Sequence, residues 1–157
     1  MREAFPEAEH SEEEWDVLKH YCVVLPDGCA IELHRVSMDF SEPKEFEKYQ
    51  RLETEAMVQS VFGLKVGNTE IDVPEEKFNL LFTFLHAWEH FCGTGMPMKQ
   101  VCDLALLAHQ SYGIKNQAER AEMDAYLQDN LRYFGMLEVW QMVGAAIVKM
   151  LNLPAEE

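Results

Sequence analysis

The sequence predicts an α+β fold, in which a small antiparallel hairpin near the N-terminus precedes about five helices packed as a helical bundle. Apolar and β-branched residues in segments 21–25 and 29–36 flank a Pro-Asp-Gly turn, a strong hairpin signal. Segment 78–92 is apolar on nearly every helical face, as expected of a central, buried helix. Glycine and proline then divide the rest of the chain into further helix-length segments.

Two helices are predicted on either side of the hairpin. Residues 11–19 are expected to form a short helix that Ser11 caps. Residues 42–62 place their apolar side chains at helical spacing, and Gly63 is expected to end that helix. Residues 64–74 then favour two short extended pieces around a Gly-Asn pair.

The second half of the chain is predicted to be helical to its end. The expected helices are 78–92, 98–112, 116–131 and 137–151. Trp140, Met142 and Met150 in the last of them indicate packing in the core or at an interface.

One domain over residues 1–157 is the simplest organisation. Apolar residues make up 48% of the chain, enough for a core, and no internal repeat or Pro/Gly/Ser-rich linker divides it. Within that domain we expect a helix plus hairpin in residues 1–40 and a mainly helical part in residues 41–157.

The net charge of −15 argues against nucleic acid as a partner. A surface this negative repels phosphate backbones, so nucleic acid is not an expected partner.

No apolar run is long enough to cross a bilayer, which excludes a membrane partner. The N-terminal segment is polar and acidic, unlike a signal peptide, and predicts a cytoplasmic location. The four cysteines lack CxxC spacing and are expected to be buried free thiols.

A first candidate site lies on the second strand of the hairpin. Strand alternation places Glu32 and His34 on one face, with Arg35 next in the chain. A carboxylate and an imidazole aligned in this way can hold a metal ion or act in acid–base chemistry. The same pattern is typical of a sheet whose polar face meets water, so both interpretations stay open.

A second candidate lies in the most apolar helix. His86 and His90 are four residues apart, so they share a helix face, and Glu89 lies beside them. Histidines at this spacing can chelate zinc. The pattern H-x-x-E-H also occurs in a class of metalloproteases, but the chain is much shorter than those enzymes. Buried histidines that are hydrogen-bonded to neighbours are the alternative interpretation.

A third candidate lies at the start of the next helix. Asp103 follows Lys99 by one helical turn, which allows an ion pair within the helix. Asp103 could instead meet His86 or His90 across the helix pair and orient an imidazole.

Several segments of the chain, in a fixed order, resemble one family. In chain order they are His20-Tyr21, Ile31-Glu32-Leu33-His34-Arg35, Phe78-Asn79-Leu80-Leu81-Phe82, His86 with His90-Phe91, Lys99-Gln100-Val101-Cys102-Asp103, Trp140 and Leu151-Asn152-Leu153-Pro154. Their order and spacing resemble the C-terminal portion of bacterial uncharacterised nucleotidyltransferase-like proteins, over roughly residues 11–154.

The resemblance implies transferase chemistry with Mg²⁺. In that superfamily a Gly-Ser turn holds phosphates, and a D-x-D pair with a third carboxylate holds two divalent metal ions. Glu32 matches the strand that supplies the third carboxylate and is the implied catalytic residue. His34 and Arg35 would flank the site, and Lys99 and Asp103 are further candidates for substrate binding.

The chain departs from the family pattern in its catalytic motifs. It has no Gly-Ser dipeptide and no D-x-D, which in the family precede the point where this chain begins. The chain alone is therefore not expected to transfer nucleotides, and a nucleotide is expected to bind only if the full-length protein is intact. A homodimer, or pairing with the missing N-terminal segment, is expected to cover the exposed strand edges.

Two other classes of function are compatible with the sequence. The chain could be a non-catalytic, acidic interaction module that meets a basic partner. It could also be a small metal-binding protein that uses His86 and His90, with Glu89 or Asp103 as a further group.

Overall fold

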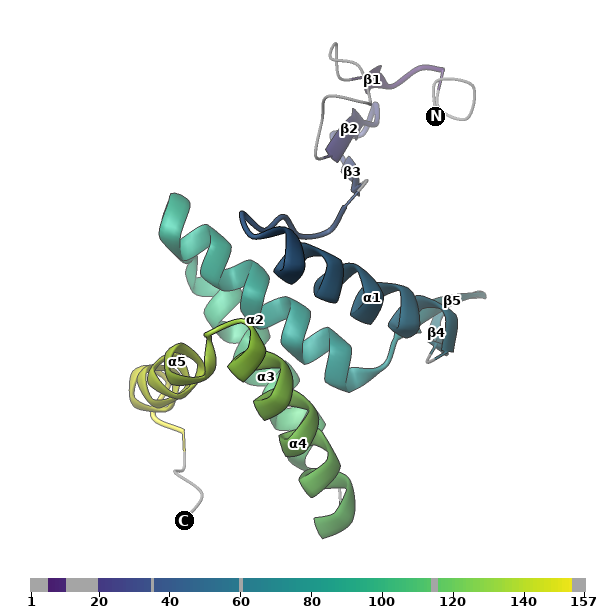
Figure 1. The fold of residues 1–157 in the computed structure, drawn as a ribbon. Coiled ribbons are helices and arrows are strands. Elements are labelled where there is room, and N and C mark those ends of the chain that lie inside the picture. Colours follow the sequence, from purple (N-terminus) through teal and green to yellow (C-terminus); the bar gives the residue numbers. More distant parts are fainter. Residues whose placement is uncertain (1–5, 11–19, 35, 60, 114–115, 154–157) are drawn as a thin grey trace. The chain divides into compact units, whose positions relative to one another are not determined.

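The computed structural model describes residues 6–10, 20–34, 36–59, 61–113 and 116–153, which divide into two compact units, Met1–Ser41 and Glu42–Glu157 (Figure 1). The border between the units coincides with the expected change from hairpin to helices near residue 40. The fold class is α+β, as predicted. The predicted helix at 11–19 lies outside the described residues. No described helix has the length and apolar character needed to cross a membrane.

The first unit contains a three-stranded antiparallel sheet with the order β1-β2-β3. Its strands are β1 (Glu9–His10), β2 (His20–Val24) and β3 (Ala30–His34). The predicted hairpin of β2 and β3 is confirmed, with Cys22 opposite Glu32 and Val23 opposite Ile31. The short strand β1, which the sequence pattern did not indicate, pairs with the other side of β2.

The turn between β2 and β3 follows from its residue types. The Leu25 carbonyl accepts a hydrogen bond from the Gly28 N–H at 2.8 Å, and the Leu25 N–H donates to the Cys29 carbonyl at 2.8 Å. The Asp27 carboxylate accepts from the Cys29 N–H at 3.0 Å. Gly28 has φ 83°, a conformation that side chains other than glycine rarely adopt, so Pro-Asp-Gly fixes both the turn and the register of β3.

The second unit begins with a helix and a second hairpin: α1 (Pro43–Gln59), β4 (Val61–Val66) and β5 (Thr69–Pro74). The two extended pieces around the Gly-Asn turn are confirmed. The expectation that Gly63 ends the preceding helix is wrong, because Gly63 pairs with Asp72 inside β4. The carboxylate end of the exposed Glu70 side chain lies in the space beside Gly63 on the same hairpin.

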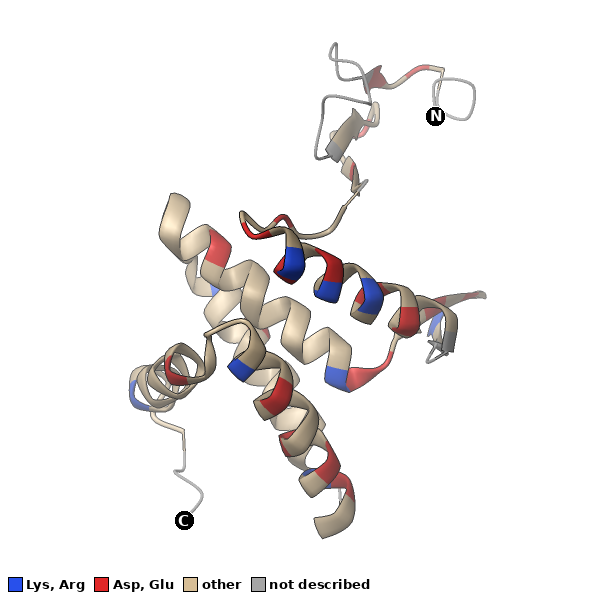
Figure 2. Ribbon diagram, in the orientation of Figure 1, with Lys and Arg blue, Asp and Glu red and all other residues tan. Residues whose placement is uncertain are grey.

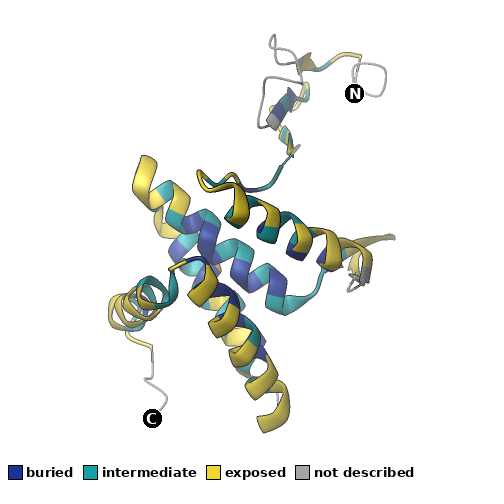
Figure 3. Cartoon of the chain, in the orientation of Figure 1, coloured by how far each residue is buried: buried dark blue, intermediate teal, exposed yellow. Residues whose placement is uncertain are grey.

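Helix α2 (Glu76–Gly93) forms the core of the second unit, as predicted. Leu80, Leu81 and Phe84 are completely buried. Helices α1, α3 and α4 all contact α2. Figure 3 shows the buried residues running along α2, whereas the outer faces of its neighbours are exposed.

Three further helices complete the unit: α3 (Met98–Gly113), α4 (Gln117–Tyr133) and α5 (Leu137–Met150). The predicted helix ends at Gly113 and near Gly135 are confirmed. Asn116 caps α4 by accepting hydrogen bonds from the N–H groups of Ala118 and Glu119 at 3.0 and 3.1 Å. The Glu119 carboxylate accepts from the Asn116 N–H at 3.0 Å and completes a capping box.

Two packing expectations hold only in part. On α5, Trp140 packs edge-on against Phe84, with ring centroids 5.0 Å apart, whereas Met142 and Met150 are exposed, so their packing at an interface stays a prediction. The four cysteines are free, as expected, but Cys29 and Cys92 are exposed rather than buried. Composition indicated how many apolar side chains the chain has, but not which face of a short helix or turn they occupy.

Leu81→Ala is expected to lower the free energy of unfolding by about 2–5 kcal/mol, because it opens a cavity among packed helices. Leu106→Ala on α3 is the matched control, since Leu106 is 60% exposed, and should change stability by less than about 0.5 kcal/mol. Urea unfolding followed by circular dichroism measures both effects. Equal losses in the two variants would contradict the central position of α2.

Candidate functional site

Glu32 and His34 share the exposed face of β3, as the strand alternation predicts. The His34 Nε2 lies 3.6 Å from a carboxylate oxygen of Glu32. Ile31 and Leu33, on the opposite face, are half-buried. The Glu32 side chain is 55% exposed and that of His34 is 32% exposed, so the carboxylate and the imidazole are presented together at the surface. Arg35 lies outside the described residues.

The position of β3 in its sheet adds a second feature to this site. In the order β1-β2-β3, β3 is an edge strand of the described sheet. One side of an edge strand carries backbone N–H and C=O groups that can pair with a further strand. Glu32 and His34 therefore stand next to a place where another segment of chain can be added.

His86 and His90 also lie together, near the C-terminal end of α2. Their Nε2 atoms are 3.2 Å apart, within hydrogen-bond distance. The rings meet edge to face, with centroids 4.6 Å apart and planes at 89°. The helical spacing thus places both imidazoles on one face, as predicted.

The neighbours of His86 come from α2 itself. A Glu89 carboxylate oxygen lies 3.8 Å from the His86 Nδ1. The Phe82 ring stacks on the His86 ring, with centroids 5.5 Å apart and an interplanar angle of 18°. The stacking constrains the plane of the imidazole, whereas the carboxylate lies beyond hydrogen-bond distance and contributes its negative charge.

Lys99 and Asp103 lie on α3 and are both exposed. No ion pair links the two side chains in the described part of the chain. Among the described contacts, no hydrogen bond or ion pair joins Asp103 to His86 or His90 either, so the alternative contact across the helix pair is not seen. Glu89, which the sequence pattern places beside the two histidines, is the carboxylate near His86.

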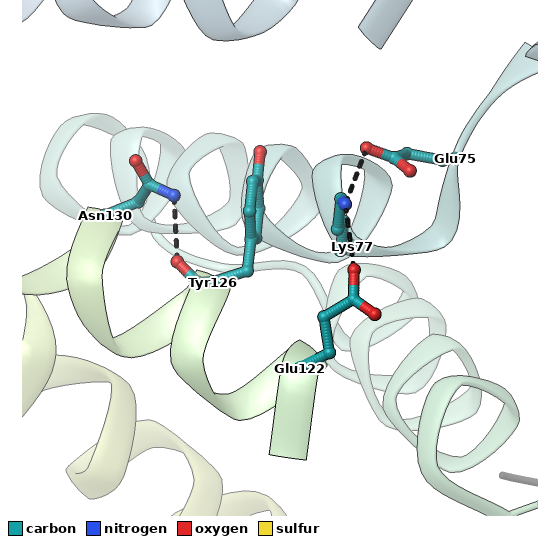
Figure 4. Close-up of polar contacts among 5 residues, drawn as sticks. All are labelled: Glu75, Lys77, Glu122, Tyr126 and Asn130. Carbon is teal, nitrogen blue, oxygen red and sulfur yellow. Dashed lines mark hydrogen bonds and ion pairs between the residues drawn. The ribbon is translucent and has the colours of Figure 1, made fainter. Parts of the chain in front are cut away.

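A polar cluster at the start of α2, which the sequence reasoning missed, links this helix to α4 (Figure 4). The Lys77 ammonium lies 3.4 Å from a Glu75 oxygen and 3.5 Å from a Glu122 oxygen, and 5.4 Å from the centre of the Tyr126 ring. Lys77 is the only lysine or arginine of α2, which is the signal that could have identified it. Figure 2 shows that charged residues are frequent on α1 and α4 and sparse on α2 and α5.

Burial raises the pKa of the Tyr126 hydroxyl well above its usual value, and the negative charges of Glu75 and Glu55 raise it further. The pKa of Tyr112 is raised too, by burial and by its 2.8 Å hydrogen bond to Asp124, which joins α3 to α4. Neither tyrosine is poised to act as a base near neutral pH. We therefore assign both side chains to the packing of α4.

The donor atoms of the two histidine-containing pairs suit different metal ions. No group of three or more His, Cys, Asp or Glu is arranged to hold a metal ion within the described ranges. Glu32 brings a single carboxylate and His34 a nitrogen, whereas Mg²⁺ prefers near-octahedral oxygen ligands, so these two residues alone do not fit Mg²⁺. His86 and His90 offer two imidazole nitrogens, which suit zinc, copper or nickel.

Comparison with known proteins identifies no relative: no family model, no curated protein and no solved structure matches the chain. The family resemblance in the sequence therefore stays a prediction. Function is inferred below from the residues and geometry of this chain.

The raised pKa of Tyr126 predicts a loss of stability in alkali. Above about pH 10 the unfolded chain releases the tyrosine proton while the folded chain retains it, so the free energy of unfolding falls as pH rises. Tyr126→Phe should make this fall shallower, and Tyr112→Phe should do the same independently. Urea unfolding across the alkaline range measures it. Parallel curves for wild type and Tyr126→Phe would show that the hydroxyl is not protected from ionisation.

Proposed function

We propose that this chain supplies part of the active site of a nucleotidyltransferase-like protein, with Glu32 as one of its three carboxylates. One observation carries the proposal: Glu32 projects with His34 from the exposed face of β3, an edge strand of the described sheet. The ordered motifs of the sequence support it, because the strand that matches β3 supplies the third carboxylate in the family that the chain resembles.

The edge position indicates where the other carboxylates would come from. A strand that paired with β3 would place its nearest side chains about 4.5–5.5 Å from those of β3, measured between Cβ atoms. Carboxylates at this separation can converge on shared metal ions. We therefore infer that the D-x-D pair belongs to a segment that pairs with β3, either in a longer form of the protein or in a second polypeptide.

The chain alone has too few metal ligands to bind a nucleoside triphosphate with Mg²⁺. Glu32 is a single carboxylate, too few oxygen ligands to displace water from Mg²⁺. The net charge of −15 opposes a phosphate-bearing ligand unless metal ions neutralise it. His34 has the Glu32 carboxylate as its neighbour at 3.6 Å. The 157-residue chain is therefore proposed to be inactive by itself.

Mg²⁺ with ATP is expected to leave the melting temperature of the isolated chain unchanged. A ligand at about a hundred times its dissociation constant would add about 2.7 kcal/mol to the free energy of unfolding, which a thermal-shift assay detects easily. A clear upward shift that Glu32→Gln abolishes would show that the chain binds nucleotide without further carboxylates. In that case the proposal that the isolated chain cannot bind a nucleotide is disproved.

The intact mass of the protein purified from its source cells is expected to exceed 18.2 kDa, or the protein is expected to co-purify with a second polypeptide. That native form should transfer nucleotidyl groups with Mg²⁺, and Glu32→Gln should reduce the rate about a hundredfold or more, because several kcal/mol of charge stabilisation is lost. Glu70→Gln, at another exposed strand position, is the matched control and should retain activity. A native chain of 18.2 kDa that is alone and inactive would overturn the proposal.

A further inference from the structure

The geometry points to a separate metal site on α2, where His86 and His90 chelate a divalent transition-metal ion such as zinc beside the negative charge of Glu89. This site uses neither Glu32 nor His34, and it belongs to the second compact unit rather than the first. A test of this metal site is therefore independent of the proposed transferase function.

The separation of the two imidazole nitrogens is the first support. Two nitrogen ligands at 2.0–2.1 Å from a tetrahedral zinc ion lie about 3.3–3.4 Å from each other. The Nε2 atoms of His86 and His90 are 3.2 Å apart, with the rings at 89° to each other. The separation of the two nitrogens thus differs from that of a zinc-bound pair by about 0.1–0.2 Å.

The same distance fits a hydrogen bond between the two imidazoles in the metal-free chain, in which one Nε2–H donates to the other Nε2. A metal ion needs the lone pairs of both atoms. The proton between them must therefore leave, either to the Nδ1 of the same ring or to water. The hydrogen bond holds the pair in position, and the metal ion replaces its proton.

The surroundings of His86 orient it for this role. Phe82 stacks on the ring from the preceding turn, and the Glu89 carboxylate lies 3.8 Å from Nδ1. Metal-binding histidines commonly present their second nitrogen to a carboxylate. Here the separation is longer than a hydrogen bond, so Glu89 acts on the imidazole through its negative charge. Sequence spacing alone places all three side chains on α2, so the arrangement forms with the helix.

The exposure of the pair determines what kind of site this is. The His86 side chain is 33% exposed, and among the described residues no third protein ligand joins the two histidines. The remaining coordination positions therefore belong to water or to an external ligand, as in open metal sites. Two imidazoles favour Cu²⁺, Zn²⁺ and Ni²⁺ over Mg²⁺ and Ca²⁺.

The test is a calorimetric titration of the tag-free 157-residue chain with zinc chloride. One ion per chain is expected to bind, and magnesium chloride should give no binding heat. His90→Gln should weaken zinc binding at least tenfold, and Glu89→Gln by roughly tenfold through the loss of the negative charge beside His86. His34→Gln is the matched control, since it removes an imidazole beside a carboxylate elsewhere in the chain, and should bind zinc like wild type.

Circular dichroism of each variant separates a lost ligand from a lost fold. Absence of zinc binding by the wild-type chain would overturn the inference, as would equal affinity in wild type and His90→Gln. Loss of binding in His34→Gln instead would move the site to β3 and overturn it as well. If His90→Gln does not fold, the zinc affinity of Glu89→Gln, which only replaces a carboxylate by an amide of the same size, is the deciding measurement.

Discussion

Burial of α2 is the constraint on which the second unit depends. A helix that is apolar on nearly every face must be covered from several sides, because each large apolar side chain left in water costs about 1.5–3 kcal/mol. Leu80, Leu81 and Phe84 are completely buried, and α1, α3 and α4 all pack against this helix. Trp140 of α5 adds an aromatic contact with Phe84. The charges of the unit are consequently carried mainly by the covering helices (Figure 2).

The same constraint decides where α2 can hold polar side chains. A charge in the packed middle of the helix would lose its hydration without compensation. Lys77 lies in the first turn, where it meets two carboxylates and its stem can cover the Tyr126 ring. Glu89 and His90 lie in the last turns, with His86 one turn before them. Packing and polar chemistry are thus separated along the length of one helix, and each end is available for a different role.

Local chemistry explains which features of the sequence could be predicted. The Pro-Asp-Gly turn, the apolar core helix and the helix end at Gly113 depend on residues within a few positions, and all were confirmed. Gly63 was misassigned because it pairs with Asp72 across the hairpin, a partner that local spacing does not show. The carboxylate beside His86 is Glu89, which the helical spacing had placed there, whereas the alternative contact of Asp103 depends on how two helices pack. The pairing of the histidines was predictable, whereas the separation of their nitrogens was not.

The two candidate sites differ in the donor atoms they offer, and this difference decides what each can do. An oxygen ligand on an edge strand suits a hard cation, but a hard cation keeps its water unless several carboxylates compete for it, so Glu32 needs partners from beyond this hairpin. Two imidazole nitrogens on one helix face suit a softer cation, and they need no other segment because the helix itself sets their spacing. An incomplete oxygen site and a self-contained nitrogen site can therefore occur in one chain without either requiring the other. The ligand set at a strand edge is completed by the strand that pairs with it, whereas a helix face can hold its whole ligand set on one segment.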